Sequence, residues 1–126
     1  MPTKRVLIID DDPFIREVAQ TCLEVTAGWE VLTAPGGPEG LALAATEQLD
    51  AIVLDVMMPG MDGPTVFARL QADEATRGIP VVFLTAKAGA DERARLTAAG
   101  AAGALEKPFD PRTLAQRVAA FVGWPA

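Results

Sequence analysis

Hydrophobic and polar positions follow two rhythms along the chain. Five short apolar segments, rich in β-branched residues, are separated by segments in which apolar residues recur every three or four positions. Short apolar runs are typical of buried strands, and the longer spacing is typical of one face of a helix. The predicted strands cover residues 5–9, 30–33, 51–54, 81–84 and 103–106.

Five strand-helix units predict an α/β fold of the (βα)5 type, with a doubly wound parallel five-stranded sheet. Connections between parallel strands are strongly biased to be right-handed, and near-continuous apolar strands need helices on both faces. Asp12 is expected to cap a first helix over 13–27, which ends at Gly28. Loops at 35–38 and 58–63 precede the second and third helices. The fourth and fifth helices are expected near 91–99 and 111–122, the last capped by Asp110.

Apolar residues at helical spacing predict which helix faces are buried. The expected stripes are Phe14, Val18, Cys22 and Val25 in the first helix, Leu41, Ala44, Ala45 and Leu49 in the second, Val66, Phe67 and Leu70 in the third, and Leu114, Val118 and Phe121 in the fifth.

The size of the chain predicts one domain over residues 1–126, because 126 residues of which 50% are hydrophobic suit a single core. The longest apolar runs fall far short of the roughly 20 residues that span a bilayer. Three aspartates follow the first apolar segment closely, which is the wrong order for a secretory signal peptide. We therefore expect a cytoplasmic protein without a membrane span.

Charge and composition exclude several functions. A net charge of -6 without a basic cluster disfavours direct nucleic-acid binding. The chain has no histidine, which excludes a Ser-His-Asp or Cys-His nucleophile and a phosphohistidine of its own. Cys22, the single cysteine, has no partner for an internal disulfide and is interpreted as a small core residue.

Polar residues stand where four predicted strands end. Asp10, Asp11 and Asp12 follow the first strand, and Asp55 follows the third. Thr85 and Lys107 follow the fourth and fifth strands. In open parallel sheets, ligands bind outside the carboxyl ends of the strands. We therefore expect these side chains to converge, except that Asp12, like Asp62, is interpreted as a helix cap or turn residue.

Converging carboxylates predict a cation and a phosphoryl-transfer site. Ionised carboxylates repel one another, and their oxygens suit a hard ion such as Mg²⁺, which keeps several water ligands. A carboxylate can also act as a nucleophile and form an aspartyl phosphate, for which Asp55 is the candidate. Thr85 and Lys107 could then neutralise the oxygens of the phosphoryl group.

Four motifs resemble the receiver domains of two-component response regulators, and the match covers nearly the whole chain. The resemblance implies a flavodoxin-like fold, similar to that of chemotaxis regulators, with strand order 2-1-3-4-5, in a bacterial signalling protein. The motifs are Val6-Leu7-Ile8-Ile9-Asp10-Asp11-Asp12, Leu54-Asp55-Val56-Met57-Met58-Pro59-Gly60-Met61-Asp62-Gly63, Leu84-Thr85-Ala86 and Lys107-Pro108-Phe109.

The resemblance also implies roles for individual residues. Asp55 would be the phosphoacceptor and a magnesium ligand. Asp11 would bind Mg²⁺ directly, Asp10 would assist through water, and Met57 would contribute its backbone carbonyl. Such a domain is not an enzyme in the ordinary sense, because it catalyses only its own phosphorylation and dephosphorylation.

The strand-5 region carries the remaining implied features. Thr85 and Lys107 would contact the phosphoryl group, and the Lys107–Pro108 peptide bond would be cis. The family's aromatic switch position is Ala104 here. Because alanine cannot swing a ring behind Thr85, we expect a smaller output rearrangement, or one that runs through the helix at 91–99 and Lys87.

Partners follow from the same resemblance. The phosphoryl donor would be a histidine kinase or a histidine phosphotransfer protein. The face formed by 91–99, 103–106 and 111–122 would switch contacts with a downstream protein or an output domain, and could also support a homodimer. Whether the chain is a stand-alone regulator or a piece of a longer protein stays open, with a slight lean to the former because it begins with methionine.

Three alternatives have specific arguments. A docking or dimerisation module that has lost phosphorylation would not need the complete set of Asp10, Asp11, Asp55, Thr85 and Lys107. A magnesium-dependent phosphohydrolase with an aspartate nucleophile would need a second aspartate where Met57 stands. A nucleotide-binding domain would need a Walker loop or a Gly-x-Gly-x-x-Gly turn after the first strand.

Overall fold

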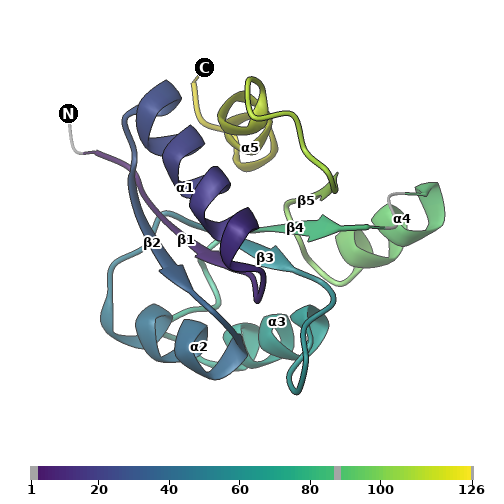
Figure 1. Ribbon diagram of the computed structural model, residues 1–126. Helices are drawn as coiled ribbons and strands as arrows, with labels where there is room; N and C mark the ends of the chain where they lie inside the picture. The colour runs from purple at the N-terminus through teal and green to yellow at the C-terminus, as the bar shows by residue number, and fades with distance from the viewer. Residues whose placement is uncertain (1–2, 87–88, 126) are drawn as a thin grey trace.

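A computed structural model describes residues 3–86 and 89–125. One parallel sheet with strand order β2-β1-β3-β4-β5 forms the centre, and helices cover both of its faces (Figure 1). The predicted fold class and strand order are therefore confirmed. The elements are β1 (Arg5–Ile9), α1 (Pro13–Ala27), β2 (Glu30–Ala34), α2 (Gly37–Thr46), β3 (Ala51–Asp55), α3 (Gly63–Ala72), β4 (Val81–Thr85), α4 (Ala90–Ala98), β5 (Gly103–Glu106) and α5 (Leu114–Val122).

Alternate residues of each strand contribute to two separate cores. In β1, Leu7 and Ile9 pack with residues of α2, α3 and α4. Val6 and Ile8 pack on the opposite face with residues of α1 and α5. This alternation follows from the two-residue repeat of a strand, and burial of both faces explains the continuous apolar runs in the sequence.

The buried face of helix α1 includes Cys22 and partly Val18, as predicted, but not Phe14 or Val25. Ala19, Cys22 and Leu23 are buried, whereas Phe14 and Val25 are 69% and 78% exposed. The helix carries apolar residues on two sides, and helical spacing alone does not tell which side meets the sheet. The predicted cap is confirmed: the Asp12 carboxylate accepts hydrogen bonds from the backbone N–H groups of the first turn.

Helix α2 begins inside the predicted loop and ends earlier than expected. It starts at Gly37, Ala45 is exposed, and Leu49 lies beyond its end, partly buried against the core. Its buried face includes Gly40, where a Cβ atom would lie 2.8 Å from Cγ1 of Ile9. Glycine therefore lets this helix approach β1 more closely than a face of larger side chains would allow.

Helix α5 begins at Leu114, with Thr113 and not Asp110 as its N-cap. The Asp110 carboxylate instead accepts a hydrogen bond from the Arg112 backbone N–H at 2.9 Å, which closes a separate turn before the helix. Phe121, which its spacing predicted to be buried, is 37% exposed. Its ring lies against Gly103 of β5, leaving no room for a Cβ atom there.

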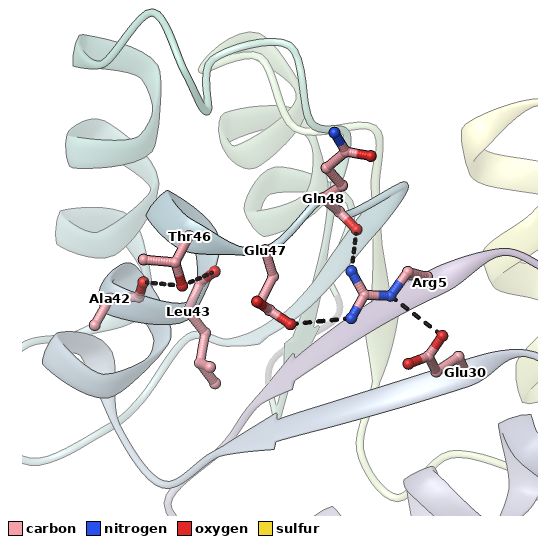
Figure 2. A network of polar contacts seen from close by, with 7 residues as sticks. All are labelled: Arg5, Glu30, Ala42, Leu43, Thr46, Glu47 and Gln48. Atoms are coloured by element: carbon pink, nitrogen blue, oxygen red, sulfur yellow. Dashed lines mark hydrogen bonds and ion pairs between the residues drawn. The ribbon is translucent and has the colours of Figure 1, made fainter.

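Arg5 ties the first residue of β1 to neighbouring segments (Figure 2). Its guanidinium lies 3.2 Å from Glu30 and 3.0 Å from Glu47, and donates a hydrogen bond to the Gln48 carbonyl. Its backbone N–H donates to Asp50 at 2.8 Å. These contacts fix the N-terminal ends of the strands, opposite the C-terminal ends where Asp10 and Asp55 lie.

Candidate functional site

The carboxyl ends of the strands bring three aspartates together, as predicted. Asp10 follows β1 and is fully buried, and Asp55 ends β3 and is 3% exposed. Asp11 is exposed at the rim. One carboxylate oxygen from each of the three lies within 4.8 Å of the others. This spacing lets a single cation contact all three groups.

Lys107 reaches the same pocket from the end of β5. Its ammonium nitrogen lies 2.8 Å from Oδ2 of Asp10 and 3.1 Å from Oδ1 of Asp55. Its backbone N–H donates to the Thr85 carbonyl at 2.8 Å, which extends the pairing of β4 with β5. The Lys107–Pro108 peptide bond is cis, as the resemblance implied.

The loop between β1 and α1 holds Asp10 through several hydrogen bonds. The Asp10 N–H donates to the Ala34 carbonyl at 3.2 Å, and the Asp12 N–H donates to Oδ1 of Asp10 at 2.9 Å. The Arg16 guanidinium donates to the Asp10 carbonyl at 2.8 Å. Arg16 was missed in the sequence, because a bond to a backbone carbonyl leaves no pattern among the side chains.

The loop between β3 and α3 folds back beneath Asp55. The Gly63 N–H donates to the Val56 carbonyl at 2.8 Å, and the Asp62 carboxylate caps α3 as predicted. A Cβ atom on Gly63 would clash with the Asp55 carbonyl and lie 2.9 Å from Cα of Val56. A glycine is therefore required for this close approach. The Met57 side chain points outward and is 74% exposed.

The electrostatics of the pocket make Asp55 easier to protonate than an exposed aspartate. Burial raises the pKa of Asp55 to about 6, and the negative charge of Asp10 acts in the same direction, while Lys107 opposes both. Burial alone would lower the pKa of Lys107, but the carboxylates of Asp10 and Asp55 outweigh it and raise that pKa. Lys107 therefore stays cationic.

The pocket fits a hard divalent cation. Oδ2 of Asp10 is buried and makes no hydrogen bond among the described residues, so its contact with Lys107 is an ion pair without hydrogen-bond geometry. This oxygen thus has the Lys107 charge beside it but keeps unused capacity to accept hydrogen bonds or bind a cation. Together with Asp11 and Asp55 it offers the oxygen ligands that Mg²⁺ prefers.

Thr85 is the last residue of β4, and Ala104 lies within β5. Thr85 is buried and pairs in register with Glu106, and Ala104 is buried opposite Phe83. The Phe83 ring packs edge to face on Phe67 at 5.6 Å, so the aromatic group of this core lies on β4 and not on β5. Lys87, to which we assigned a possible output role, lies outside the described residues.

Among the described residues, no helix combines the length and the apolar character that crossing a bilayer requires.

Two relatives match nearly the whole chain. The DNA-binding dual master transcriptional regulator RpaA of Synechocystis sp. is 44% identical over 118 residues, which are 94% of this chain and 48% of RpaA. The phosphate regulon transcriptional regulatory protein PhoB of Pseudomonas aeruginosa is 39% identical, over 95% of this chain and 52% of PhoB. The chain thus spans about half the length of these relatives.

Solved structures show the same likeness. Chemotaxis protein CheY4 of Vibrio cholerae superposes with a TM-score of 0.88 at 33% identity, over 95% of this chain and 99% of that one. The receiver domain of sensor histidine kinase PA1611 from Pseudomonas aeruginosa, solved with a magnesium ion in its active site cleft, gives a TM-score of 0.84 at 27% identity, over 97% and 99%. The family model of the response regulator receiver domain matches residues 6–119. The chain therefore belongs to the response regulator receiver domain family, whose members serve two-component signalling.

Proposed function

We propose that Asp55 is the phosphoacceptor of this receiver and takes a phosphoryl group from a partner's phosphohistidine in a Mg²⁺-dependent reaction. One observation carries the proposal: the buried Asp55 carboxylate lies 3.1 Å from the Lys107 ammonium in a pocket that it shares with Asp10 and Asp11. A buried nucleophile beside a cation is the arrangement that phosphoryl transfer needs.

The chemistry assigns a task to each side chain. An Asp55 oxygen attacks phosphorus, the bond from phosphorus to the donor's imidazole nitrogen breaks, and that nitrogen keeps the electron pair. The Lys107 ammonium and the Thr85 hydroxyl stabilise negative charge on the phosphoryl oxygens. Attack by water on the acyl phosphate later releases inorganic phosphate and regenerates Asp55. The domain thus acts only on itself.

We assign the metal ligands to the carboxylates of Asp11 and Asp55 and the backbone carbonyl of Met57, with Asp10 assisting through water. The proximity of the three carboxylates and the unused acceptor capacity of Asp10 Oδ2 support this set. When bound, Mg²⁺ would neutralise charge on the carboxylates and on the phosphoryl oxygens.

The outward face of α1 supports a docking site for the phosphoryl donor. Phe14, Val18 and Val25 line an apolar groove of about 540 Å³ together with Pro111, from the segment before α5. This face begins directly after the β1–α1 loop, so a partner covering it would bring a histidine to Asp55. We propose that this partner is a histidine kinase or a histidine phosphotransfer protein, acting in the cytoplasm where ATP supplies the phosphoryl group.

Signal output is proposed to pass through α4, β5 and α5 to a downstream protein or to an output domain, with a homodimer through that face as one form of contact. The rival function, a docking module that works without phosphorylation, would give the ion pairs of Lys107 with Asp10 and Asp55 only a structural role. The three carboxylates gathered beside one ammonium favour the phosphoacceptor instead, because they leave an excess of negative charge that a divalent cation would neutralise.

The test is incubation with Mg²⁺ and a small acyl phosphate, followed by intact-mass analysis. The unchanged protein should gain one phosphoryl group, and Asp55→Asn should gain none. Asp62→Asn is the matched control, because Asp62 is an exposed helix cap in the adjoining loop and should leave the adduct intact. An unmodified wild type, or an equal adduct on Asp55→Asn, would refute the proposal.

A further inference from the structure

Arg16 makes a contact that the proposed chemistry has not used. It lies half-buried near the start of α1, and its Nη1 donates a hydrogen bond to the Asp10 carbonyl at 2.8 Å. That carbonyl lies one residue beyond Ile9, whose pairing with Leu54 ends the ladder of β1 with β3. The guanidinium therefore satisfies a backbone acceptor that the sheet ladder no longer serves.

Helix stability does not explain a cation at this position. The first turns of a helix present unpaired N–H groups and favour negative charge, so an arginine there opposes the helix dipole. Helix α1 already has a proline in its first turn and the Asp12 carboxylate as its cap. The place of Arg16 is instead explained by the acidic loop in front of it.

Arg16 differs from Lys107 in the atoms it contacts. The Lys107 ammonium lies against carboxylate oxygens of Asp10 and Asp55. Arg16 donates to the backbone carbonyl of Asp10 and not to its carboxylate. It therefore adds positive charge and fixes the loop without occupying an oxygen that a metal ion would use.

We propose that Arg16 is a positioning residue for the divalent cation: by holding the Asp10 carbonyl, it orients the peptide that joins Asp10 to Asp11. The Asp10 N–H and Oδ1 are already fixed by Ala34 and Asp12, so Arg16 completes the restraint of this residue. This inference rests on the magnesium site of the proposed function.

The experiment measures Mn²⁺ binding by the loss of the free-ion electron paramagnetic resonance signal, without any phosphoryl donor. Arg16→Met keeps the length of the side chain but removes its charge and donors, and should weaken binding about tenfold, as loss of a ligand-orienting partner typically does. Arg16→Lys keeps one charged donor and should lose less. Arg77→Met is the matched control, because Arg77 is exposed and paired with Glu74 away from the pocket.

The rate of phosphorylation then tells whether Arg16 acts only on metal binding or also on the phosphoryl-transfer step. In Arg16→Met, saturating Mn²⁺ should restore most of the wild-type rate with acyl phosphate. Unchanged Mn²⁺ affinity in Arg16→Met, or a rate that saturating metal does not restore, would overturn the inference. If circular dichroism shows that Arg16→Met does not fold, the Mn²⁺ affinity of Arg16→Lys is the deciding measurement. An affinity equal to that of the wild type would then overturn the inference.

Failure of the proposed function can be distinguished from failure of this inference, because the first is measured on the unchanged protein and the second on the Arg16 variants. Absence of Mn²⁺ binding by the unchanged protein would overturn the metal site, and this inference with it, before any variant is compared. Mn²⁺ binding without a phosphoryl adduct would overturn only the role of Asp55 as acceptor, and the affinities of the Arg16 variants would still be decisive.

Discussion

The ammonium nitrogen of Lys107 lies 3.1 Å from Oδ1 of Asp55, although Lys107 follows β5 and Asp55 ends β3, and β4 lies between these two strands in the sheet. This contact offsets part of the repulsion between Asp55 and Asp10, and it places a cation where phosphoryl oxygens would carry negative charge. Lys107→Met should therefore slow phosphorylation by acyl phosphate roughly 100-fold or more, as loss of one stabilising donor typically does. The initial rate of adduct formation measures the effect.

Lys4→Met is the control for this substitution. The Lys4 ammonium lies 4.9 Å from the centre of the Trp124 ring, just before β1. Lys4→Met therefore removes the same charge from the chain as Lys107→Met does. Its rate should stay within about twofold of wild type, since a surface charge far from the pocket is screened by salt. A Lys107→Met rate close to that of Lys4→Met would remove Lys107 from the chemistry.

The pKa of Asp55 predicts how stability varies with pH in the absence of metal. Burial raises it from 3.8 to about 6, so the folded state binds the proton more tightly than the unfolded state does. The favourable contribution is fully present below about pH 4 and is lost as pH rises through about 6. The free energy of unfolding should fall over this window by roughly 2–3 kcal/mol on account of Asp55.

Urea denaturation followed by the fluorescence of Trp29 and Trp124 measures this dependence. Subtracting the curve of Asp55→Asn isolates Asp55, because the other acidic groups are common to both proteins. Added Mg²⁺ should reverse the loss near neutral pH by stabilising the ionised carboxylate. A difference between the two proteins that does not vary with pH would contradict the raised pKa.

Gly63 should be intolerant of any side chain. Because a Cβ atom would clash with the Asp55 carbonyl and crowd Val56, Gly63→Ala must move the loop that carries Met57. We expect a loss of roughly 2–4 kcal/mol in the free energy of unfolding. Gly78→Ala is the control, since its Cβ would meet nothing within 4 Å, and it should stay within about 0.5 kcal/mol of wild type.

The α1 face offers a test that separates the donor from the chemistry. Phe14 is 69% exposed, so Phe14→Ala should cost little stability. It should slow transfer from a cognate phosphohistidine partner about tenfold or more, as truncation of an exposed aromatic anchor at an interface does. Phosphorylation by a small acyl phosphate should be unchanged. Equal slowing of both reactions would place Phe14 in the pocket and not at a docking surface.

The sequence predicted the site better than the helix faces around it. Asp10, Asp55 and Lys107 could be placed together because parallel strands end at one edge of a sheet, which is a property of topology alone. The buried face of α1 was predicted correctly at Cys22 and wrongly at Phe14 and Val25, because apolar residues on neighbouring sides of this helix share the same spacing and periodicity does not tell which side meets the sheet.

Two further features depended on contacts that sequence patterns do not record. The start of α5 was placed too early because Asp110 is a good capping residue, but it caps its own turn. Arg16 was overlooked because its partner is the backbone carbonyl of Asp10. A cation at the N-terminus of a helix, where the dipole disfavours it, is the signal that could have indicated it.

Ala104 gives the last prediction, which concerns output. It is buried opposite Phe83, whose ring already packs on Phe67, so β5 has no aromatic side chain that could follow Thr85 inward. On addition of beryllofluoride and Mg²⁺, a mimic of the phosphorylated state, amide chemical shifts should change around Asp55, Thr85 and α4 and remain small in α5. The control is Asp55→Asn, which should show no such changes. Changes of equal size throughout α4, β5 and α5 would mean that the switch does not need an aromatic residue at position 104, because a two-state rearrangement moves all of its elements together.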